Sequence, residues 1–503
     1  GCIGPKKIQR PWKAAILCIR QPRRVTFKAT GGQAMTFDVA IIGGGVSGLS
    51  AAYALTAQGY KVVVLERQIR PGGNAQSEKF GGFLMEHGPS SVNAQAMEAV
   101  GLSRDLGLES LRTELDTQVK SRYLVGGGRL QGISTHPLGF LMSGYLSPLA
   151  RLRLMSEMII PRRKSDGEET IAEFWGRRFG REFTDKVIDP LVAGLYAGKA
   201  ENLSVNAVFP TIVEMERQYG SISRAVLSKR FRNGRMPGRR LFSWTDGIGT
   251  LPTALANQLG STIRTGVVVT SLTRIAKGFK ISTAKSGAVS ARAVIIATQP
   301  HVSASLLEAM DASAAQAISE IAAPPIAVAF LGYRRNQVDH PLDGLGFLAP
   351  AGEKRPLSGA LFPSSMFTNR APVGHVALSG YVGGARAPDM ALMSTQDITA
   401  LAREEFGDLL GATGEPVVSR VRQWSQGLPQ LTTGHGRRLK RIHEAEQRHP
   451  GLFVTGNYFT GPAIATCVKQ SIETCARIDG FLAGKKYPED TDGSSDAEAA
   501  IAS

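Results

Sequence analysis

The stretch 37–67 constrains the fold of this chain more than any other. It opens with a short apolar, β-branched run and a glycine-rich turn, continues with leucine and alanine at helical spacing, and closes with a second apolar run before Glu66. Short continuous apolar runs are typical of strands buried in a parallel sheet, and the leucine spacing is typical of a helix. The stretch therefore predicts a strand–helix–strand unit with parallel strands.

The turn has the pattern G-x-G-x-x-G at Gly43, Gly45 and Gly48. The first glycine permits a tight turn, the second lets a pyrophosphate approach the backbone, and the third lets the helix pack close to the strand. The free N–H groups that begin the helix favour phosphate, and a carboxylate at the end of the second strand can bind ribose hydroxyls. We therefore predict a dinucleotide site rather than a structural glycine turn, with these residues: Gly43, Gly44, Gly45, Val46, Ser47, Gly48, Glu66 and Arg67.

Length and composition narrow the class of protein. With 503 residues the chain can form two or three domains, and no run of 18 uncharged apolar residues predicts a transmembrane helix. The cysteines show neither a disulfide framework nor a metal-binding spacing, and the eight histidines form no cluster, so we expect a reducing compartment and no metal. The net charge of +17 suits an acidic small molecule or an anionic membrane surface. Because the basic residues are scattered and no binding motif occurs, we expect no nucleic-acid partner.

Both ends of the sequence differ from the rest in composition. Residues 1–35 are basic and contain no Asp or Glu. We interpret 1–34 as an extension outside the fold, which could be upstream translation, a targeting-like leader or a cloning remnant. The tail 486–503 is rich in Asp, Glu, Ser and Ala, which predicts disorder. We expect a cytoplasmic protein or one at the cytoplasmic face of a membrane, and an organellar one if 1–34 is a transit peptide.

Two more glycine motifs follow the first unit. They are Gly72-Gly73, and Glu86 followed after one residue by Gly88-Pro89. This order and spacing resembles the flavin-dependent amine oxidase superfamily. The resemblance implies an α/β fold with a Rossmann-like FAD-binding domain of the p-hydroxybenzoate hydroxylase and amine oxidase type. It also implies a mixed-sheet substrate domain, a helical membrane-facing domain and non-covalently bound FAD.

Later segments are similar to the protoporphyrinogen oxidase family within that superfamily. They include Arg122-Tyr123, residues 189–198, residues 344–350, the spaced Trp424, Pro429-Gln430 and Gly434-His435, and the final loop before a helix over 465–481. The similarity covers about 37–482, with departures from the family pattern at Asn74, Gln76 and Thr466. It implies these additional FAD-binding residues: Gly73, Asn74, Gly88, Pro89, Ser90, Val269, Trp424, Gly456, Pro462, Ala463 and Ile464.

The same resemblance implies a tetrapyrrole site. Its expected residues are Arg122, which would grip a propionate, with Leu195, Leu348 and Phe362 on apolar walls. For Arg122 the alternative is an ordinary surface arginine. We expect no catalytic side chain, because the flavin supplies the redox chemistry.

The resemblance also predicts domain boundaries. The FAD-binding domain would comprise 36–117, 241–320 and 421–485, the helical domain 118–240, and the substrate sheet 321–420. Thr170 and Glu173 predict a capping box that starts a helix over 170–183. The apolar but interrupted segment 138–160 would be either core or a surface in a membrane interface.

The resemblance to the protoporphyrinogen oxidase family implies an FAD-dependent oxidase that converts protoporphyrinogen to protoporphyrin with O₂ as acceptor, in haem biosynthesis. Two alternatives stay open: another flavin oxidase or desaturase acting on a polyene or heterocycle, and a flavin-binding scaffold without turnover. Peripheral membrane association, a homodimer and transfer of the product to a chelatase are compatible with this prediction. The sequence leaves open whether the porphyrinogen carries two propionates or four.

Overall fold

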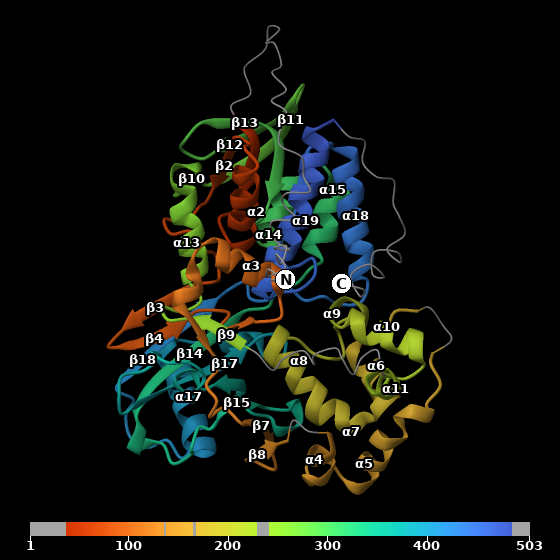
Figure 1. Ribbon diagram of the computed structural model, residues 1–503, viewed down its shortest axis with the longest axis vertical. Coiled ribbons are helices and arrows are strands. Elements are labelled where there is room, and N and C mark those ends of the chain that lie inside the picture. Colours follow the sequence, from red (N-terminus) through yellow and green to blue (C-terminus); the bar gives the residue numbers. More distant parts are fainter. Residues whose placement is uncertain (1–36, 135–136, 164–166, 229–240, 485–503) are drawn as a thin grey trace, which may run out of the picture.

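The computed structural model describes residues 37–134, 137–163, 167–228 and 241–484. The predicted N-terminal extension and the C-terminal tail lie outside these residues. The described chain forms an upper lobe around one seven-stranded sheet, and a lower lobe in which a second seven-stranded sheet lies beside a group of helices (Figure 1).

The upper sheet contains the predicted strand–helix–strand unit. Its strand order is β10-β2-β1-β13-β12-β11, and β19 pairs with the end of β13. The pairs β10–β2, β2–β1, β1–β13 and β13–β19 are parallel, whereas β11 and β12 form an antiparallel extension. The strands span β1 Phe37–Ile42, β2 Val62–Leu65, β10 Ile263–Arg264, β11 Val269–Ile275, β12 Gly278–Thr283, β13 Ala288–Ile296 and β19 Leu452–Val454.

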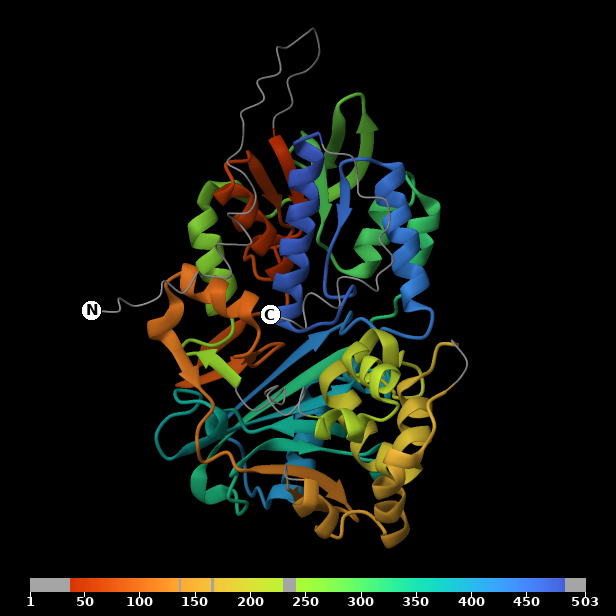
Figure 2. The same ribbon diagram turned by 45° about the vertical axis from the view of Figure 1, so that its right-hand side comes forward.

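Helices cover both faces of this sheet (Figure 2). Val39 and Ile41 of β1 point into the core on one face, and Ala40 and Ile42 into the core on the other. Burial on both sides explains why the strand is continuously apolar rather than alternating. The first face carries α2 Val46–Ala57, α13 Thr250–Leu259 and α19 Ile464–Leu482, and the second carries α14 Pro300–Leu307, α15 Ala312–Ser319 and α18 His435–Arg448.

The lower sheet has the order β18-β14-β17-β16-β15-β7-β8. All its pairs are antiparallel except β15–β7. α17 (Thr395–Leu410) packs on one face, and we call the other face the open face. The strands are β7 Ser121–Gly126, β8 Arg129–Ile133, β14 Ile326–Arg334, β15 Gly344–Leu348, β16 Leu357–Leu361, β17 His375–Gly383 and β18 Val418–Trp424.

This sheet differs from the predicted domain boundaries at two places. β7 and β8 belong to it, although we expected 118–240 to be helical, and β18 belongs to it rather than to the FAD-binding domain. Both departures arise because edge strands join the sheet from distant parts of the sequence, and local patterns do not encode such pairing.

Small elements connect the two lobes. Phe83 and Met85 of β4 pack on the open face against Val328 and Phe330. These elements are β3 Ser77–Phe80 paired with β4 Phe83–Glu86, β5 Val92–Asn93 and β6 Arg112–Glu114 flanking β9 Leu241–Trp244, α3 Met97–Asp105 and α16 Pro363–Met366.

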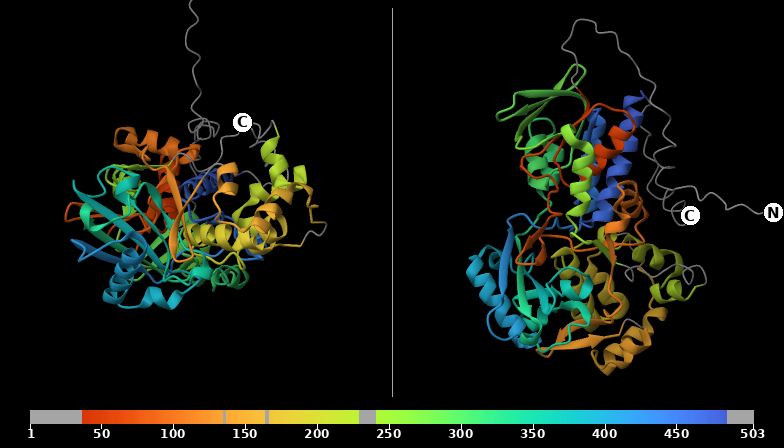
Figure 3. Two further views of the ribbon diagram at one scale, coloured as in Figure 1. Left: turned by 90° about the horizontal axis from the view of Figure 1, so that it is seen from below. Right: turned by 60° about the vertical axis from the view of Figure 1, so that its left-hand side comes forward.

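The helical region lies beside the lower sheet (Figure 3). The capping box of Thr170 and Glu173 is confirmed, but the helix ends at Phe179 because the chain turns at Gly180, whose φ is +94°. A further helical turn and a π-helical segment, Thr184–Ile188, then lead into α8. The helices are α4 Pro137–Met142, α5 Pro148–Met155, α6 Ile171–Phe179, α7 Arg181–Phe183, α8 Asp189–Tyr196, α9 Val205–Val208, α10 Pro210–Tyr219 and α11 Ile222–Leu227.

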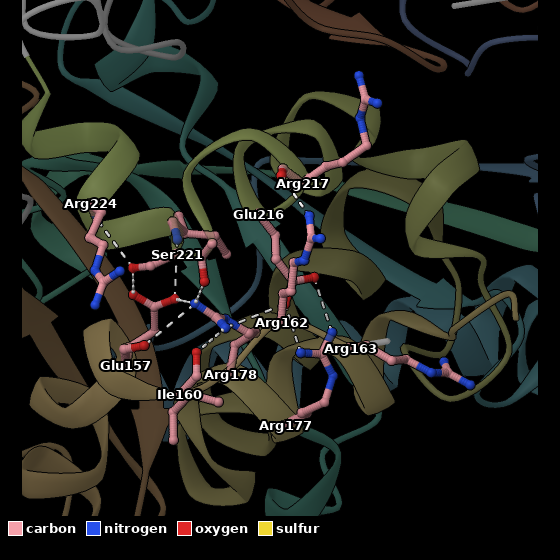
Figure 4. A network of polar contacts seen from close by, with 12 residues as sticks. Glu157, Ile160, Arg162, Arg163, Arg177, Arg178, Glu216, Arg217, Ser221 and Arg224 are labelled. Atoms are coloured by element: carbon pink, nitrogen blue, oxygen red, sulfur yellow. Dashed lines mark hydrogen bonds and ion pairs between the residues drawn. The ribbon is translucent and has the colours of Figure 1, made fainter. Parts of the chain in front are cut away.

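A buried charge network joins four of these helical segments (Figure 4). Glu157 and Arg178 form an ion pair whose side chains are both completely buried. Glu157 also accepts hydrogen bonds from the Ser221 hydroxyl at 2.7 Å and from two N–H groups that begin α11. The Arg178 guanidinium donates to the carbonyls of Ile160 and Gly220. The network therefore fixes α11 and the segment after α5 against α6.

The segment 138–160 exposes several large apolar side chains, although Tyr145, Leu146 and Glu157 within it are buried. The side chains of Met142, Leu149 and Ile159 are 75%, 80% and 78% exposed, and Leu152 and Met155 are also exposed. No helix in the described part of the chain is both long enough and apolar enough to span a membrane.

Candidate functional site

The glycine turn after β1 forms a cradle with an open space at Gly45. A Cβ on Gly43 would lie 2.6 Å from the Ala297 carbonyl oxygen, and one on Gly48 would lie 2.0 Å from the Gly43 carbonyl oxygen. These two glycines are therefore required by the protein's own packing. A Cβ on Gly45 would meet only Gly73 Cα, at 3.9 Å, so the space there is free for a ligand.

A second glycine segment closes the cradle. Gly45 and Gly72 form a parallel β-bridge, and the Gly72 N–H donates to the Gly44 carbonyl at 2.7 Å. α2 begins at Val46 with no side chain capping it and no acidic residue in its first turn. The start of a helix without a side-chain cap, facing two side-chain-free segments, suits a pyrophosphate.

Glu66 lies at the end of β2 with its carboxylate held in place. Its two oxygens accept the N–H groups of Gly44, at 2.6 Å, and Gln68, at 2.7 Å. Each carboxylate oxygen has further acceptor capacity, so the group can still bind ribose hydroxyls. Arg67, by contrast, is exposed beside it. Val269 begins β11, which an irregular segment separates from β10.

The other expected cofactor residues line the path from this cradle to the junction of the lobes. Gly88 lies so close to the Asn74 carbonyl oxygen that a Cβ would approach it to 2.5 Å. Trp424 donates its indole N–H to the His87 carbonyl at 2.8 Å, which ties the edge strand β18 to the segment before Gly88, Pro89 and Ser90.

The final loop leads into the long helix α19. Gly456 and Gly461 have φ values of +155° and +124°, and α19 starts at Ile464, after Pro462 and Ala463, with no side-chain cap. Burial raises the pKa of the Cys467 and Cys475 thiols, which lie in the core between α19 and the upper sheet. Thiols held protonated in the core do not favour a covalent flavin link. Together these segments fit an extended dinucleotide.

The open face of the lower sheet carries Arg122. Register places Arg122 on the face of β7 that Leu124 shares, whereas Tyr123 points to the α17 side. The guanidinium is half-buried, and its one hydrogen bond to the described residues is a long one, to the Ser121 carbonyl at 3.4 Å. Burial lowers the pKa of Arg122, and no carboxylate among the described residues lies within ion-pair distance of it.

The apolar residues predicted for the tetrapyrrole site divide into two groups. Leu348 lies on the open face next to Gly194 of α8, and Leu195 of α8 is 53% exposed. Phe362 is different, because its side chain is completely buried in the α17-side core against Phe347 and His340. It has no exposed surface to offer a substrate, so the expectation that Phe362 lines the tetrapyrrole site is wrong. Phe362 follows β16 but faces the α17 side of the sheet rather than the open face.

Sequence reasoning missed polar groups at the junction of the lobes. Glu86 accepts the Ser77 hydroxyl at 2.5 Å and the Ile248 N–H at 3.0 Å, with Arg370 at 3.8 Å. Burial raises the pKa of Glu86 to about 7, against the lowering effects of Ser77 and Arg370. The hydroxyl of Tyr381, on the open face nearby, has no hydrogen-bond partner in the described part of the chain, and burial raises the pKa of this tyrosine. An isolated acid or tyrosine in a strand gives no sequence signal of such a position.

Comparison with known proteins agrees with this geometry. The sequence profile of the family described as flavin containing amine oxidoreductase matches residues 46–479, which is most of the chain. The chain belongs to this family. Its members are flavin enzymes, so the protein is an FAD-dependent oxidoreductase, and we expect the cradle to hold the cofactor.

Relatives of this flavin enzyme cover nearly its full length. The chloroplastic protoporphyrinogen oxidase of Nicotiana tabacum is 29% identical over 484 residues, which are 91% of this chain and 88% of the relative. The coproporphyrinogen III oxidase of Bacillus subtilis is 28% identical over 455 residues, 86% of this chain and 96% of the relative. A crystal structure of a candidate protoporphyrinogen oxidase from Exiguobacterium sp. 255-15 has a TM-score of 0.78 at 22% identity. It covers 89% of this chain and 99% of that one, and it supports the fold.

The site contains what an FAD-dependent oxidation requires of a protein. Bound flavin supplies the acceptance of a hydride and its own reoxidation. The residues described here would bind the cofactor's phosphates and ribose, present a largely apolar sheet face, and offer the half-buried Arg122 on it. In the described ranges, no cluster of three or more His, Cys, Asp or Glu side chains has a metal-binding arrangement.

Proposed function

We propose that this flavin enzyme oxidises a porphyrinogen to the porphyrin, with O₂ as electron acceptor, in haem biosynthesis. The observation that carries the proposal is Arg122, a half-buried guanidinium without a carboxylate partner among the described side chains, beside the apolar Leu124 and Leu348 of the open face. A porphyrinogen is a large apolar ring with propionates on its rim. It would place its body on the sheet and a propionate on the arginine.

The register of the lower sheet supports this arrangement. Across the open face, Leu124 pairs with Leu348, Leu348 with Gly359, and Gly359 with Tyr381. Neighbouring strands lie about 4.8 Å apart, so Tyr381 is roughly 14 Å from Leu124. This row gives an apolar platform with Arg122 at one end and a neutral phenol at the other.

The residues contribute by placement rather than by bond formation. Arg122 would hold the propionate through a charge-assisted, bidentate contact. Leu348, and Leu195 from α8, would exclude water from the reacting carbon. The side chains of this face include no nucleophile activated by a neighbouring base, which agrees with chemistry that the cofactor performs.

An anaerobic titration tests the proposal. The purified FAD-loaded protein is mixed without oxygen with protoporphyrinogen and, separately, with coproporphyrinogen. We expect protoporphyrinogen to bleach the flavin absorbance near 450 nm, and air to restore it with formation of fluorescent porphyrin and hydrogen peroxide. A flavin that neither porphyrinogen reduces contradicts the proposal. Bleaching by a polyene would then support the desaturase alternative, and no turnover at all would support the scaffold.

We also propose that the exposed apolar surface of α4, α5 and the 3₁₀ turn Ser156–Ile159 docks on an anionic membrane. Single exposed apolar residues are ordinary, but this surface gathers several large ones within 18 residues, next to the exposed cation Arg162. A lipophilic substrate would reach the lower lobe from that side. Homodimer formation, transfer of the product to a chelatase and the compartment stay predictions.

Flotation with phosphatidylserine-containing liposomes tests the docking surface. We expect the wild-type protein to float and a Leu149→Glu, Ile159→Glu variant to stay in the soluble fraction. Val373→Glu is the matched control, because Val373 is fully exposed but lies outside this surface. If the double variant floats as well as the wild-type protein does, the surface is not the docking site.

A further inference from the structure

Arg422 lacks hydrogen-bond and ion-pair partners among the described residues. It lies on β18 and shares the open face with Val328 and Tyr381 through the strand register. Its guanidinium stacks over the Trp424 ring at 4.1 Å. Its Nε is buried and has no hydrogen-bond partner, and no carboxylate of the described chain forms an ion pair with it.

Other buried or half-buried arginines have acceptors for their terminal guanidinium nitrogens, although the Nε of Arg386 also lacks a partner. Arg370 donates to the Ser243 hydroxyl and to three backbone carbonyls, and Arg386 donates to Asp189 and to the Ala349 carbonyl. A buried donor without a partner costs about 1–3 kcal/mol, so such groups are normally completed by protein, water or ligand. Arg422 therefore has capacity for an acceptor that the folded chain does not supply.

The surroundings of Arg422 indicate where that acceptor lies. Trp424, on which the guanidinium stacks, donates to the His87 carbonyl, immediately before the cofactor residues Gly88 and Pro89. The His87 imidazole has a second buried atom without a partner, Nδ1. Burial and the nearby charge of Arg422 both lower the pKa of His87, which keeps the imidazole neutral and Arg422 the local cation. Arg422 Nε and His87 Nδ1, two buried polar atoms without hydrogen-bond partners in the described chain, thus both lie where the FAD-binding unit contacts the sheet.

We propose that Arg422 faces the flavin end of bound FAD and stabilises its reduced form. Reduction increases negative charge on the flavin ring system, and a fixed cation at a partly buried position favours that state. Trp424 would hold the guanidinium in place through a cation–π contact. Arg422 is in this view a positioning and tuning residue, not a catalytic one. The inference rests on FAD binding and is independent of the identity of the substrate.

The reduction potential of the bound flavin tests this inference, together with FAD affinity and the visible spectrum. We expect Arg422→Gln to make two-electron reduction of the flavin about tenfold less favourable, a fall of roughly 30 mV. The flavin absorption maximum should also shift. Arg422→Lys keeps the charge without the planar fork and should retain part of the effect. A Lys variant that binds FAD also keeps the test informative if the Gln variant fails to fold.

Arg420 provides a matched control on the same strand and face. Its guanidinium also lies over an aromatic ring, that of Phe80 at 4.7 Å, but the residue is exposed. Arg420→Gln should therefore leave the potential and the spectrum unchanged. Equal potentials in the wild-type protein and both Gln variants would overturn the inference. It would also be overturned if Arg422→Gln raised only the KM for the porphyrinogen at unchanged potential, because the cation would then face the substrate.

Discussion

Two arginines in the helical region have acidic partners, whereas two on the open face of the lower sheet have none among the described residues. In the helical region Arg178 is completely buried and bonded to Glu157 and to backbone carbonyls, and Arg177 binds both Glu169 and Glu216. On the open face, Arg122 and Arg422 are half-buried and have no acidic partner among the described residues. Within the described chain, the first region supplies carboxylate and carbonyl acceptors to its arginines, although Arg178 Nε has no partner, whereas the second supplies no carboxylate. We propose that a ligand provides the missing acceptors on the open face.

Filling the space left for the cofactor should have the largest effect. Gly45→Val should abolish FAD binding, because the side chain occupies the cradle, while the fold survives because φ is −76° and a Cβ there meets no close neighbour. Flavin absorbance and thermal unfolding of the apoprotein measure the two effects. Gly48→Val is the contrast: its Cβ would overlap the Gly43 carbonyl oxygen, so both binding and stability should be lost. An FAD-loaded Gly45→Val protein would show that the pyrophosphate lies elsewhere.

Breaking the Glu157–Arg178 network should lower the free energy of unfolding without affecting FAD binding. Glu157→Ala leaves Arg178 buried without its carboxylate and removes the acceptor of two N–H groups that begin α11, so we expect a loss of about 3–5 kcal/mol in urea unfolding of the apoprotein. Arg122→Met should change the free energy of unfolding by only about 0.5 kcal/mol, because no ion pair is broken. If both variants lose the same stability, the contrast between the two regions fails.

Glu86 predicts a pH dependence at the junction of the lobes. Because burial raises its pKa in the folded protein to about 7, folding favours the protonated acid. Its contribution to stability is fully present below the unfolded pKa near 4.5 and is lost as the pH rises through 7, by on the order of 3 kcal/mol at most. Glu86→Gln should flatten the wild-type decline in apoprotein stability between pH 5 and 8. If the Glu86→Gln variant loses as much stability between pH 5 and 8 as the wild-type protein, groups other than Glu86 cause the pH dependence.

Glu157 should contribute a pH dependence of stability opposite in sign to that of Glu86, which sharpens the comparison between the helical region and the junction of the lobes. Burial alone would raise its pKa, but hydrogen bonds from Ser223, Ser221 and Arg178 hold it below the ordinary value. Its contribution is therefore present above the unfolded pKa and lost as the pH falls through the lower, folded one. The two carboxylates differ in the number of donors around them, not in depth.

The sequence predicted the parts of this molecule that depend on local patterns. The strand–helix–strand unit, its three glycines, the capping box at Thr170 and the final helix follow from turn chemistry and periodicity, and all are present. Pairing between distant segments was not predictable in this way. It places β7, β8 and β18 in one sheet, turns Phe362 into the core, and brings Arg422 to His87. Arg122 was expected from the family resemblance, whereas the position of Arg422 required the structure.

Arg122 offers the most direct test of the central claim that the open face is completed by an acidic, apolar substrate. A charge-assisted bidentate contact contributes roughly 1.5–3 kcal/mol, so Arg122→Ala should raise the KM for the porphyrinogen by about 10- to 100-fold, with a smaller loss in kcat. Arg122→Lys should restore only part of the affinity, and FAD occupancy should be unchanged in both variants. Steady-state kinetics with FAD content measured alongside gives the answer. An Ala variant with the wild-type KM would make Arg122 a surface arginine and contradict the claim.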